Sequence, residues 1–117
     1  MRKFTQAEEN ILNILWKIGK GFPKEIEAQI KNKVPYNTFL STLRKLEKDG
    51  YVGFEKFGRS HRYYPILEKN VYGRSLFKNL FKNYLGGSKE QLLSFFMEEE
   101  NVDPKEIKEI LKKFKSK

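Results

Sequence analysis

Apolar residues recur at intervals of three and four along most of the chain, and this spacing predicts helices separated by short breaks. We expect the first three helices over residues 6–18, 23–32 and 36–49. Thr5 stands three residues before Glu8, which is the spacing of a capping box at a helix start. Pro23 is a favoured first helical residue, and Gly50 ends the third helix.

The pattern changes after Gly50, where two β-prone runs cover residues 51–57 and 61–64. Gly58-Arg59-Ser60 separates the two runs and Pro65 closes the second, so we expect a hairpin. Three short helices followed by a hairpin give the element order of a winged helix, with the hairpin as the wing. The sequence therefore predicts a winged-helix domain at residues 1–66.

Residues 67–117 return to helical spacing, with breaks at Gly86-Gly87 and at Asp103-Pro104. We expect helices over residues 69–85, after Ser88 and after Pro104. The predicted fold class is mainly α with a small β-hairpin. It consists of an N-terminal winged helix-turn-helix followed by a C-terminal three-helix dimerisation region.

Dimerisation is expected because about fifty residues in three helices lie near the lower limit for an independent core. The segment is nevertheless rich in aromatic residues on more than one helical face. Such surplus apolar surface favours a second copy of the chain over packing on the N-terminal domain, which is the alternative. The predicted interface residues are Leu76, Phe77, Leu80, Phe81, Tyr84, Leu92, Phe95 and Phe96.

The net charge of +9 and the isoelectric point near 9.7 indicate a polyanionic partner. Residues 1–66 hold 13 basic and 7 acidic side chains, so most of the excess lies in the predicted winged helix. One histidine and no cysteine exclude disulfides and sulfur-ligated metals, and we expect no metal and no cofactor. The chain has no membrane-length apolar run, and its N-terminus lacks the apolar run of a signal peptide, so we expect a cytoplasmic protein.

The helix predicted over residues 36–49 has one apolar face, formed by Phe39, Leu43 and Leu46. Its opposite face carries short polar and cationic side chains, as a helix that enters the DNA major groove requires. A solvated helix face is the alternative. The candidate DNA contacts are Tyr36, Asn37, Thr38, Ser41, Arg44, Lys45 and Lys48 on this helix, with Arg59 and Arg62 in the hairpin.

Double-stranded DNA is thus the favoured partner, and two other classes of protein remain open. A winged-helix protein-interaction module would carry aromatic anchors on the exposed helix face, where Tyr36 is the one candidate. A small hydrolase would need a nucleophile and a base at a recognisable spacing, and His61 has no such companions. We therefore expect no enzymatic activity and no catalytic residue.

Short stretches along the whole chain also carry a family resemblance: Ala7-Glu8 with Ile14-Leu15-Trp16, Tyr36-Asn37-Thr38 with Leu43-Arg44-Lys45-Leu46-Glu47-Lys48 and Gly50, Gly58-Arg59 with Tyr64-Pro65, and Leu85-Gly86-Gly87-Ser88 with Glu106-Ile107. In order and spacing they resemble the penicillinase-repressor family, the BlaI/MecI-type regulators of β-lactamase and methicillin-resistance genes. The resemblance implies a homodimeric winged-helix repressor that binds an operator with inverted repeats. Copper-responsive relatives use C-terminal cysteines, which this chain lacks.

In the antibiotic-responsive members of that family, repression is relieved when a regulatory protease cuts an Asn-Phe bond in the second C-terminal helix. The matching bond in this chain joins Phe95 to Phe96, with Ser94 before it. The resemblance thus implies a possible cleavage site in which phenylalanine replaces the asparagine.

Overall fold

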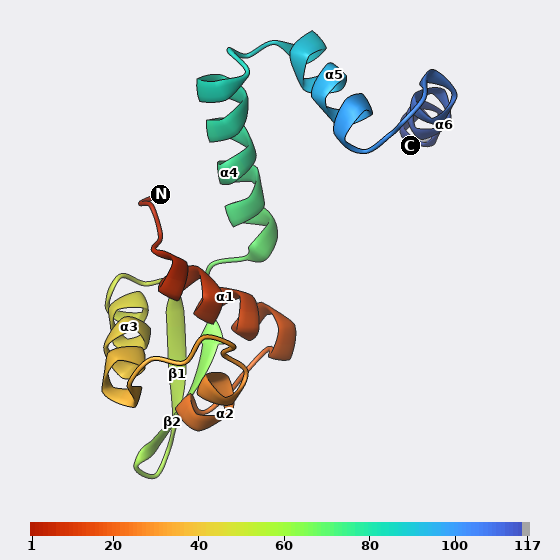
Figure 1. The fold of residues 1–117 in the computed structure, drawn as a ribbon. Helices are drawn as coiled ribbons and strands as arrows, with labels where there is room; N and C mark the ends of the chain where they lie inside the picture. Colours follow the sequence, from red (N-terminus) through yellow and green to blue (C-terminus); the bar gives the residue numbers. More distant parts are fainter. Residues whose placement is uncertain (116–117) are drawn as a thin grey trace. The chain divides into compact units, whose positions relative to one another are not determined.

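The structure of this protein is a computed structural model that describes residues 1–115. Its elements are α1 (Gln6–Ile18), α2 (Pro23–Ala28), α3 (Tyr36–Lys48), β1 (Val52–Phe57), β2 (Ser60–Pro65), α4 (Lys69–Tyr84), α5 (Lys89–Glu99) and α6 (Pro104–Lys115) (Figure 1). The predicted class, mainly helical with one hairpin, is confirmed.

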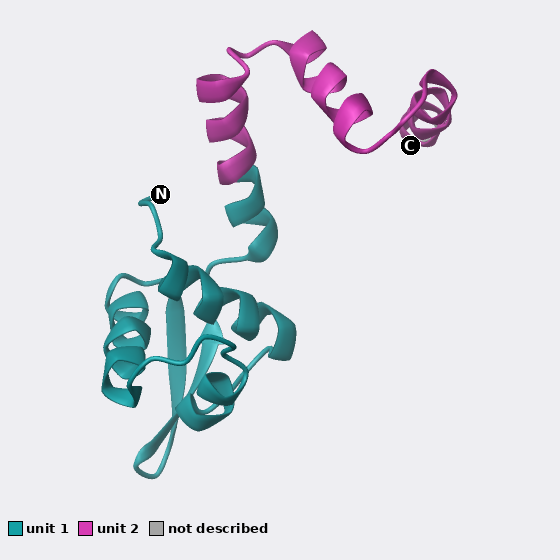
Figure 2. Ribbon diagram, in the orientation of Figure 1, with its two compact units in different colours: residues 1–74 teal, residues 75–117 magenta. Residues whose placement is uncertain are grey.

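The chain divides inside α4 into two compact units, Met1–Arg74 and Ser75–Lys117 (Figure 2). The predicted boundary between residues 66 and 67 separates two functions, DNA binding and dimerisation. That functional boundary stays a prediction.

The start of α1 shows the predicted capping box. Thr5 Oγ1 accepts a hydrogen bond from the Glu8 backbone at 3.1 Å, and the Glu8 carboxylate accepts one from Thr5 N at 2.9 Å. Arg2 donates to the same carboxylate at 3.0 Å, and its Nε donates to Asp49 at 3.0 Å. Hydrogen bonds from Arg2 hold the pKa of the buried Glu8 carboxyl at about 2, well below its usual value.

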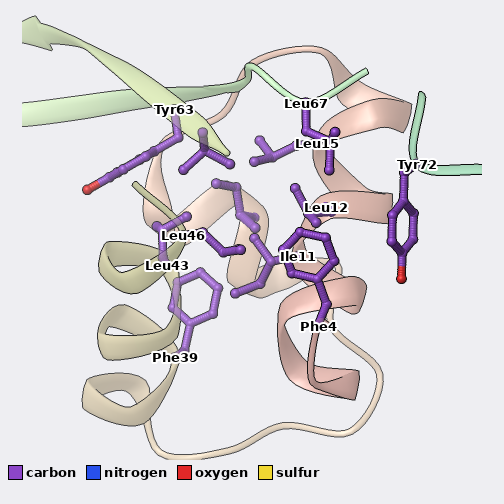
Figure 3. Packing of buried hydrophobic residues seen from close by; sticks show 12 residues of the cluster. Phe4, Ile11, Leu12, Leu15, Phe39, Leu43, Leu46, Tyr63, Leu67 and Tyr72 are labelled. Atoms are coloured by element: carbon purple, nitrogen blue, oxygen red, sulfur yellow. The ribbon is translucent and has the colours of Figure 1, made fainter. Parts of the chain in front are cut away.

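The core of the first unit is formed where α1 and α3 face each other and the hairpin (Figure 3). Leu12 and Leu15 of α1 and Leu43 and Leu46 of α3 are all fully buried, as the spacing predicted. Ile18, the last residue of α1, is 36% exposed.

The wing is an antiparallel hairpin whose register pairs Val52 with Pro65 and Phe57 with Ser60. A third short segment joins it, because Gly21 and Tyr63 exchange two backbone hydrogen bonds of 2.9 and 2.8 Å. This bridge ties the turn between α1 and α2 to β2. The first unit is therefore a winged helix.

The second helix is shorter than its apolar spacing predicted. We expected residues 23–32, but α2 ends at Ala28. Gln29 N and Ile30 N donate to carbonyls only three residues back, at 3.0 and 3.1 Å, which tightens the last turn and stops the helix. Lys33 Nζ then donates to the carbonyl of Ile30 at 2.9 Å and satisfies an acceptor that a longer helix would have used.

The beginning of α4 is fixed to α1 within the first unit. Trp16 Nε1 donates to the Leu67 carbonyl at 2.8 Å, and the Tyr72 hydroxyl donates to the Glu9 carboxylate at 2.7 Å. Burial and the negative charge of Glu9 raise the pKa of Tyr72 to about 12. The long helix therefore starts from a defined point on the winged helix.

The second unit has little core of its own. Among its described residues, 75–115, Leu85 alone is buried, at 2% exposure. Its helices nevertheless begin at regular caps: Ser88 Oγ accepts from Gln91 N at 3.1 Å, and Asp103 Oδ1 accepts from Glu106 N at 3.0 Å. None of the helices described in residues 1–115 is long and apolar enough to span a bilayer.

Candidate nucleic-acid interface

Helix α3 separates its side chains into a buried row and an exposed row. Phe39, Leu43 and Leu46 are at most 1% exposed and fix the helix on the core. The opposite side leaves polar and cationic side chains in solvent: Asn37, Thr38, Ser41, Arg44, Lys45 and Lys48. An amphipathic helix anchored in this way can present short side chains to the edges of base pairs.

The hydroxyl groups of α3 are partly committed to the helix backbone. Ser41 Oγ donates to the Asn37 carbonyl at 3.0 Å, and Thr42 Oγ1 donates to the Thr38 carbonyl at 3.1 Å. The Ser41 hydroxyl proton is therefore in use, while its oxygen lone pairs can still accept a hydrogen bond. In this state Ser41 suits a donor group such as the amino group of adenine or cytosine.

The cations of α3 differ in how freely they can move. Lys45 Nζ lies 3.5 Å from the Asp49 carboxylate, yet its side chain is 63% exposed. Such an exposed i,i+4 ion pair is worth a fraction of a kcal/mol, so a phosphate can replace the aspartate at small cost. Lys48, in the last turn, is exposed as well.

Tyr36, a predicted contact, is only half-buried, and its ring stacks on Phe39 with centroids 5.8 Å apart. Lys24 Nζ lies 3.9 Å from the centre of the Tyr36 ring. The sequence reasoning did not single out Lys24. Its position in the first turn of α2 could have indicated a phosphate contact, since the first helix of a helix-turn-helix crosses the DNA backbone.

The wing carries its cations at different distances from the tip. Gly58, with φ +61°, makes the turn, and Arg59 beside it is exposed. Arg62 is held along the strand: its guanidinium lies 3.7 Å from the Glu55 carboxylate and 4.8 Å from the centre of the Phe57 ring. Of the two predicted wing arginines, Arg59 is the one at the tip, because it lies in the turn between the end of β1 and the start of β2.

Glu55 has a second cationic partner, because Lys20 Nζ lies 2.6 Å from it. Hydrogen bonding to Lys20 lowers the pKa of this carboxyl. His61 of β2 stacks on Phe54 of β1 with centroids 4.1 Å apart. His61 thus lies against an aromatic strand neighbour.

The predicted interface residues all fall on α4 and α5. Phe81 and Leu92 are half-buried, and the others are exposed between 42% and 73%: Leu76, Phe77, Leu80, Tyr84, Phe95 and Phe96. The Phe77 and Phe81 rings stack at 5.7 Å. The prediction omitted α6, where Ile110, Leu111 and Phe114 are at least 40% exposed, although their helical spacing was visible in the sequence.

Within residues 1–115, no group of three or more His, Asp or Glu side chains is placed to hold a metal ion.

A sequence profile described as "Penicillinase repressor" matches residues 4–116. The chain belongs to the penicillinase repressor family. Among curated proteins, it is 24% identical over 110 residues to the methicillin resistance regulatory protein MecI of Mammaliicoccus sciuri and to that of Staphylococcus aureus strain N315. Each alignment covers 92% of this chain and 89% of the relative. Because the family is one of transcriptional repressors, membership supports a DNA-binding repressor and fits a protein without catalysis.

Two solved structures share the fold of this penicillinase repressor family member. The DNA-binding domain of the repressor BlaI superposes with a TM-score of 0.54 at 23% identity, covering 62% of this chain and 94% of that domain. The structure of RosR from H. salinarum superposes with a TM-score of 0.55 at 16% identity, covering 80% of this chain and 87% of RosR. At these identities the likeness concerns the fold, and the fold it supports is the winged helix.

Proposed function

We propose that this protein is a transcriptional repressor that binds a specific operator through α3, as a homodimer on an inverted repeat. The observation that carries the proposal is the exposed row of Asn37, Thr38 and Ser41 on a helix whose other face is locked into the core. Family membership supports the same function. The protein acts by occupying DNA and needs no catalytic residue.

Base recognition falls to the first turns of α3. In helix-turn-helix proteins, the N-terminal residues of the recognition helix contact base edges. Asn37 can pair with adenine, and Ser41 accepts from an amino group because its proton is engaged within the helix. Lys48 lies in the last turn, where its long side chain reaches phosphate.

The remaining cations hold the DNA backbone. Arg59 at the wing tip and Arg44 on α3 are exposed and contact phosphates or the minor groove. Arg62 contributes mainly by charge, since Glu55 and the Phe57 ring hold its side chain along the strand. These contacts supply affinity for any duplex and leave the choice of sequence to α3.

Dimerisation follows from the exposed apolar surface of α4, α5 and α6. Chains seldom leave this many large apolar side chains in water, and Leu85 alone is buried among residues 75–115. In a two-fold interface, the apolar side chains of each copy are covered by those of the other copy. Two winged helices related by a two-fold axis would then match an inverted repeat.

The repressor should leave the operator when its two protomers are separated, because the dimer holds the second winged helix at a high effective concentration near the second half-site. The bond between Phe95 and Phe96 lies inside α5, where both side chains are exposed. A regulatory protease that cuts it would sever α6 and weaken the dimer. Intact repressor in cells where the regulated gene is fully expressed would show that release takes another route.

Selection of bound sequences from a random duplex pool tests the proposed function. We expect enrichment of an inverted repeat whose affinity falls steeply with salt, by roughly four decades between 50 and 200 mM if each protomer neutralises about four phosphates. A pool without enrichment and a flat salt response would contradict the proposal. That outcome would favour the winged-helix protein-interaction module.

A further inference from the structure

A groove of about 630 Å³ lies within the first unit, between α2, α3 and the wing. Its size falls within the usual range for small-molecule sites. Phe22, Tyr36 and Tyr63 give it aromatic walls, and Lys24, Arg44 and Arg59 line it with positive charge. The groove thus combines flat apolar surfaces with cations, which is the combination that an aromatic anion needs.

Tyr63 is the buried polar residue of this groove. The residue is 4% exposed, and its backbone is fixed by the two hydrogen bonds to Gly21. Figure 3 shows its ring pointing away from the apolar cluster, with the hydroxyl at the outer end. Within residues 1–115 the structure records no hydrogen bond for this hydroxyl, and its oxygen is not one of the fully buried side-chain atoms, so it is open to solvent and can meet a ligand in the groove.

The charges around the Tyr63 hydroxyl define what can bind there. Burial and the negative charge of Glu47 raise the pKa of Tyr63, while Arg44 acts in the opposite direction. Tyr63 therefore keeps its proton at neutral pH and can donate it in a hydrogen bond. Glu47 also lines the groove, but Lys24, Arg44 and Arg59 outnumber it.

We propose that this groove binds a small aromatic carboxylate, which accepts hydrogen bonds from the Tyr63 hydroxyl and the Arg44 guanidinium while its ring packs on the aromatic walls. A DNA phosphate is the other anion within reach of Arg44 and Arg59. A phosphodiester, however, offers no ring that could pack on Phe22 and Tyr36. The structure favours the aromatic acid.

The consequence for regulation rests on the proposed function. Arg44 and Arg59 line the groove and are also candidate DNA contacts. A ligand that engages them competes with the operator, and the operator weakens ligand binding by the same factor. Such a ligand would release DNA without cleavage of the chain.

Ligand binding is measured on the full chain without DNA, so the result does not depend on operator recognition. Amide resonances of ¹⁵N-labelled protein are followed by NMR during titration with 2-naphthoate. Two matched probes separate the chemistry: 2-naphthamide keeps the ring and lacks the charge, and dimethyl phosphate keeps the charge and lacks the ring. We expect saturable shifts at Arg44, His61 and Tyr63 with 2-naphthoate, and binding at least tenfold weaker for both other probes.

Two tyrosine variants then test the hydroxyl. Tyr63→Phe should weaken 2-naphthoate binding by about tenfold, as expected for loss of a hydrogen bond to a charged group. Tyr64→Phe is the matched control, because the neighbouring Tyr64 packs on Gly53 and does not line the groove, and it should bind as the parent does. Thermal unfolding checks that both variants are folded.

The proposal is overturned if 2-naphthoate gives no saturable shifts, or if Tyr63→Phe binds it as tightly as the parent. Dimethyl phosphate binding as tightly as 2-naphthoate would also overturn it, and would assign the groove to the DNA backbone instead. With a ligand established, addition of 2-naphthoate should raise the apparent dissociation constant of the protein for DNA in proportion to ligand concentration. Ligand binding with no effect on DNA affinity would overturn the competition between the two.

Discussion

Substitution Phe96→Ala on α5 should weaken the dimer by about a thousandfold. Phe96 is 42% exposed in the single chain. A phenylalanine side chain can bury about 200 Å², so the dimer would cover about 80 Å² more of it, worth about 2 kcal/mol at about 25 cal/mol per Å². Two-fold symmetry counts each substitution twice, which gives about 4 kcal/mol and about three decades in the dissociation constant.

Sedimentation equilibrium over a wide concentration range measures this constant, and circular dichroism checks that the helices persist. Gln91→Ala is the matched control, since Gln91 is an exposed polar residue of the same helix. Phe96→Asp should act more strongly, because a carboxylate would be buried without a partner. A Phe96→Ala protein as dimeric as the parent would remove Phe96 from the interface, and a monomeric parent would refute the reasoning as a whole.

Three further predictions concern the winged helix. Arg59→Ala should weaken binding to all duplexes by a similar factor and reduce the salt slope by about one per protomer, as measured by fluorescence anisotropy; loss on one sequence only would contradict a phosphate contact. In the parent, the lowered pKa of Glu8 adds on the order of 3 kcal/mol to the free energy of unfolding above the usual glutamate pKa of about 4.5, and this contribution is lost as the pH falls towards 2. Glu8→Gln should remove the contribution, as measured by denaturant unfolding at several pH values. A variant with the same pH profile as the parent would speak against the Arg2 contact. Gly53→Ala should destabilise the fold by about 1 to 3 kcal/mol, because its Cβ would lie 2.7 Å from Cζ of Tyr64. Gly73→Ala, in an open stretch of α4, should stabilise the fold slightly. Melting temperatures of both variants equal to that of the parent would refute both expectations.

The sequence predicted the local elements well because their signals are local. The Thr5 capping box, the stop at Gly50 and the turn at Gly58 each depend on a few neighbouring residues. The end of α2 was missed because the apolar spacing continued through Ile30, while the helix was stopped by short-range backbone hydrogen bonds and by the Lys33 side chain. Periodicity alone does not contain that competition.

The candidate site could be predicted only in part, for a related reason. The exposed row on α3 follows from helical spacing around Phe39, and the structure shows the same separation of faces. Lys24 over the Tyr36 ring and the Tyr63 hydroxyl in the groove depend on contacts between elements distant in sequence. The attachment of Tyr72 to Glu9 spans 63 residues and is of the same kind.

The central claim is that α3 reads base sequence, and Asn37→Ala tests it most directly. The dissociation constants of the parent and the variant are compared on the selected operator and on a random duplex at the same salt concentration, with Asn70→Ala in the exposed first turn of α4 as the control. We expect Asn37→Ala to lose about 1 to 3 kcal/mol on the operator and much less on the random duplex, and Asn70→Ala to bind both as the parent does. An equal loss on both duplexes, or none on the operator, would contradict the assignment of α3 as the recognition helix.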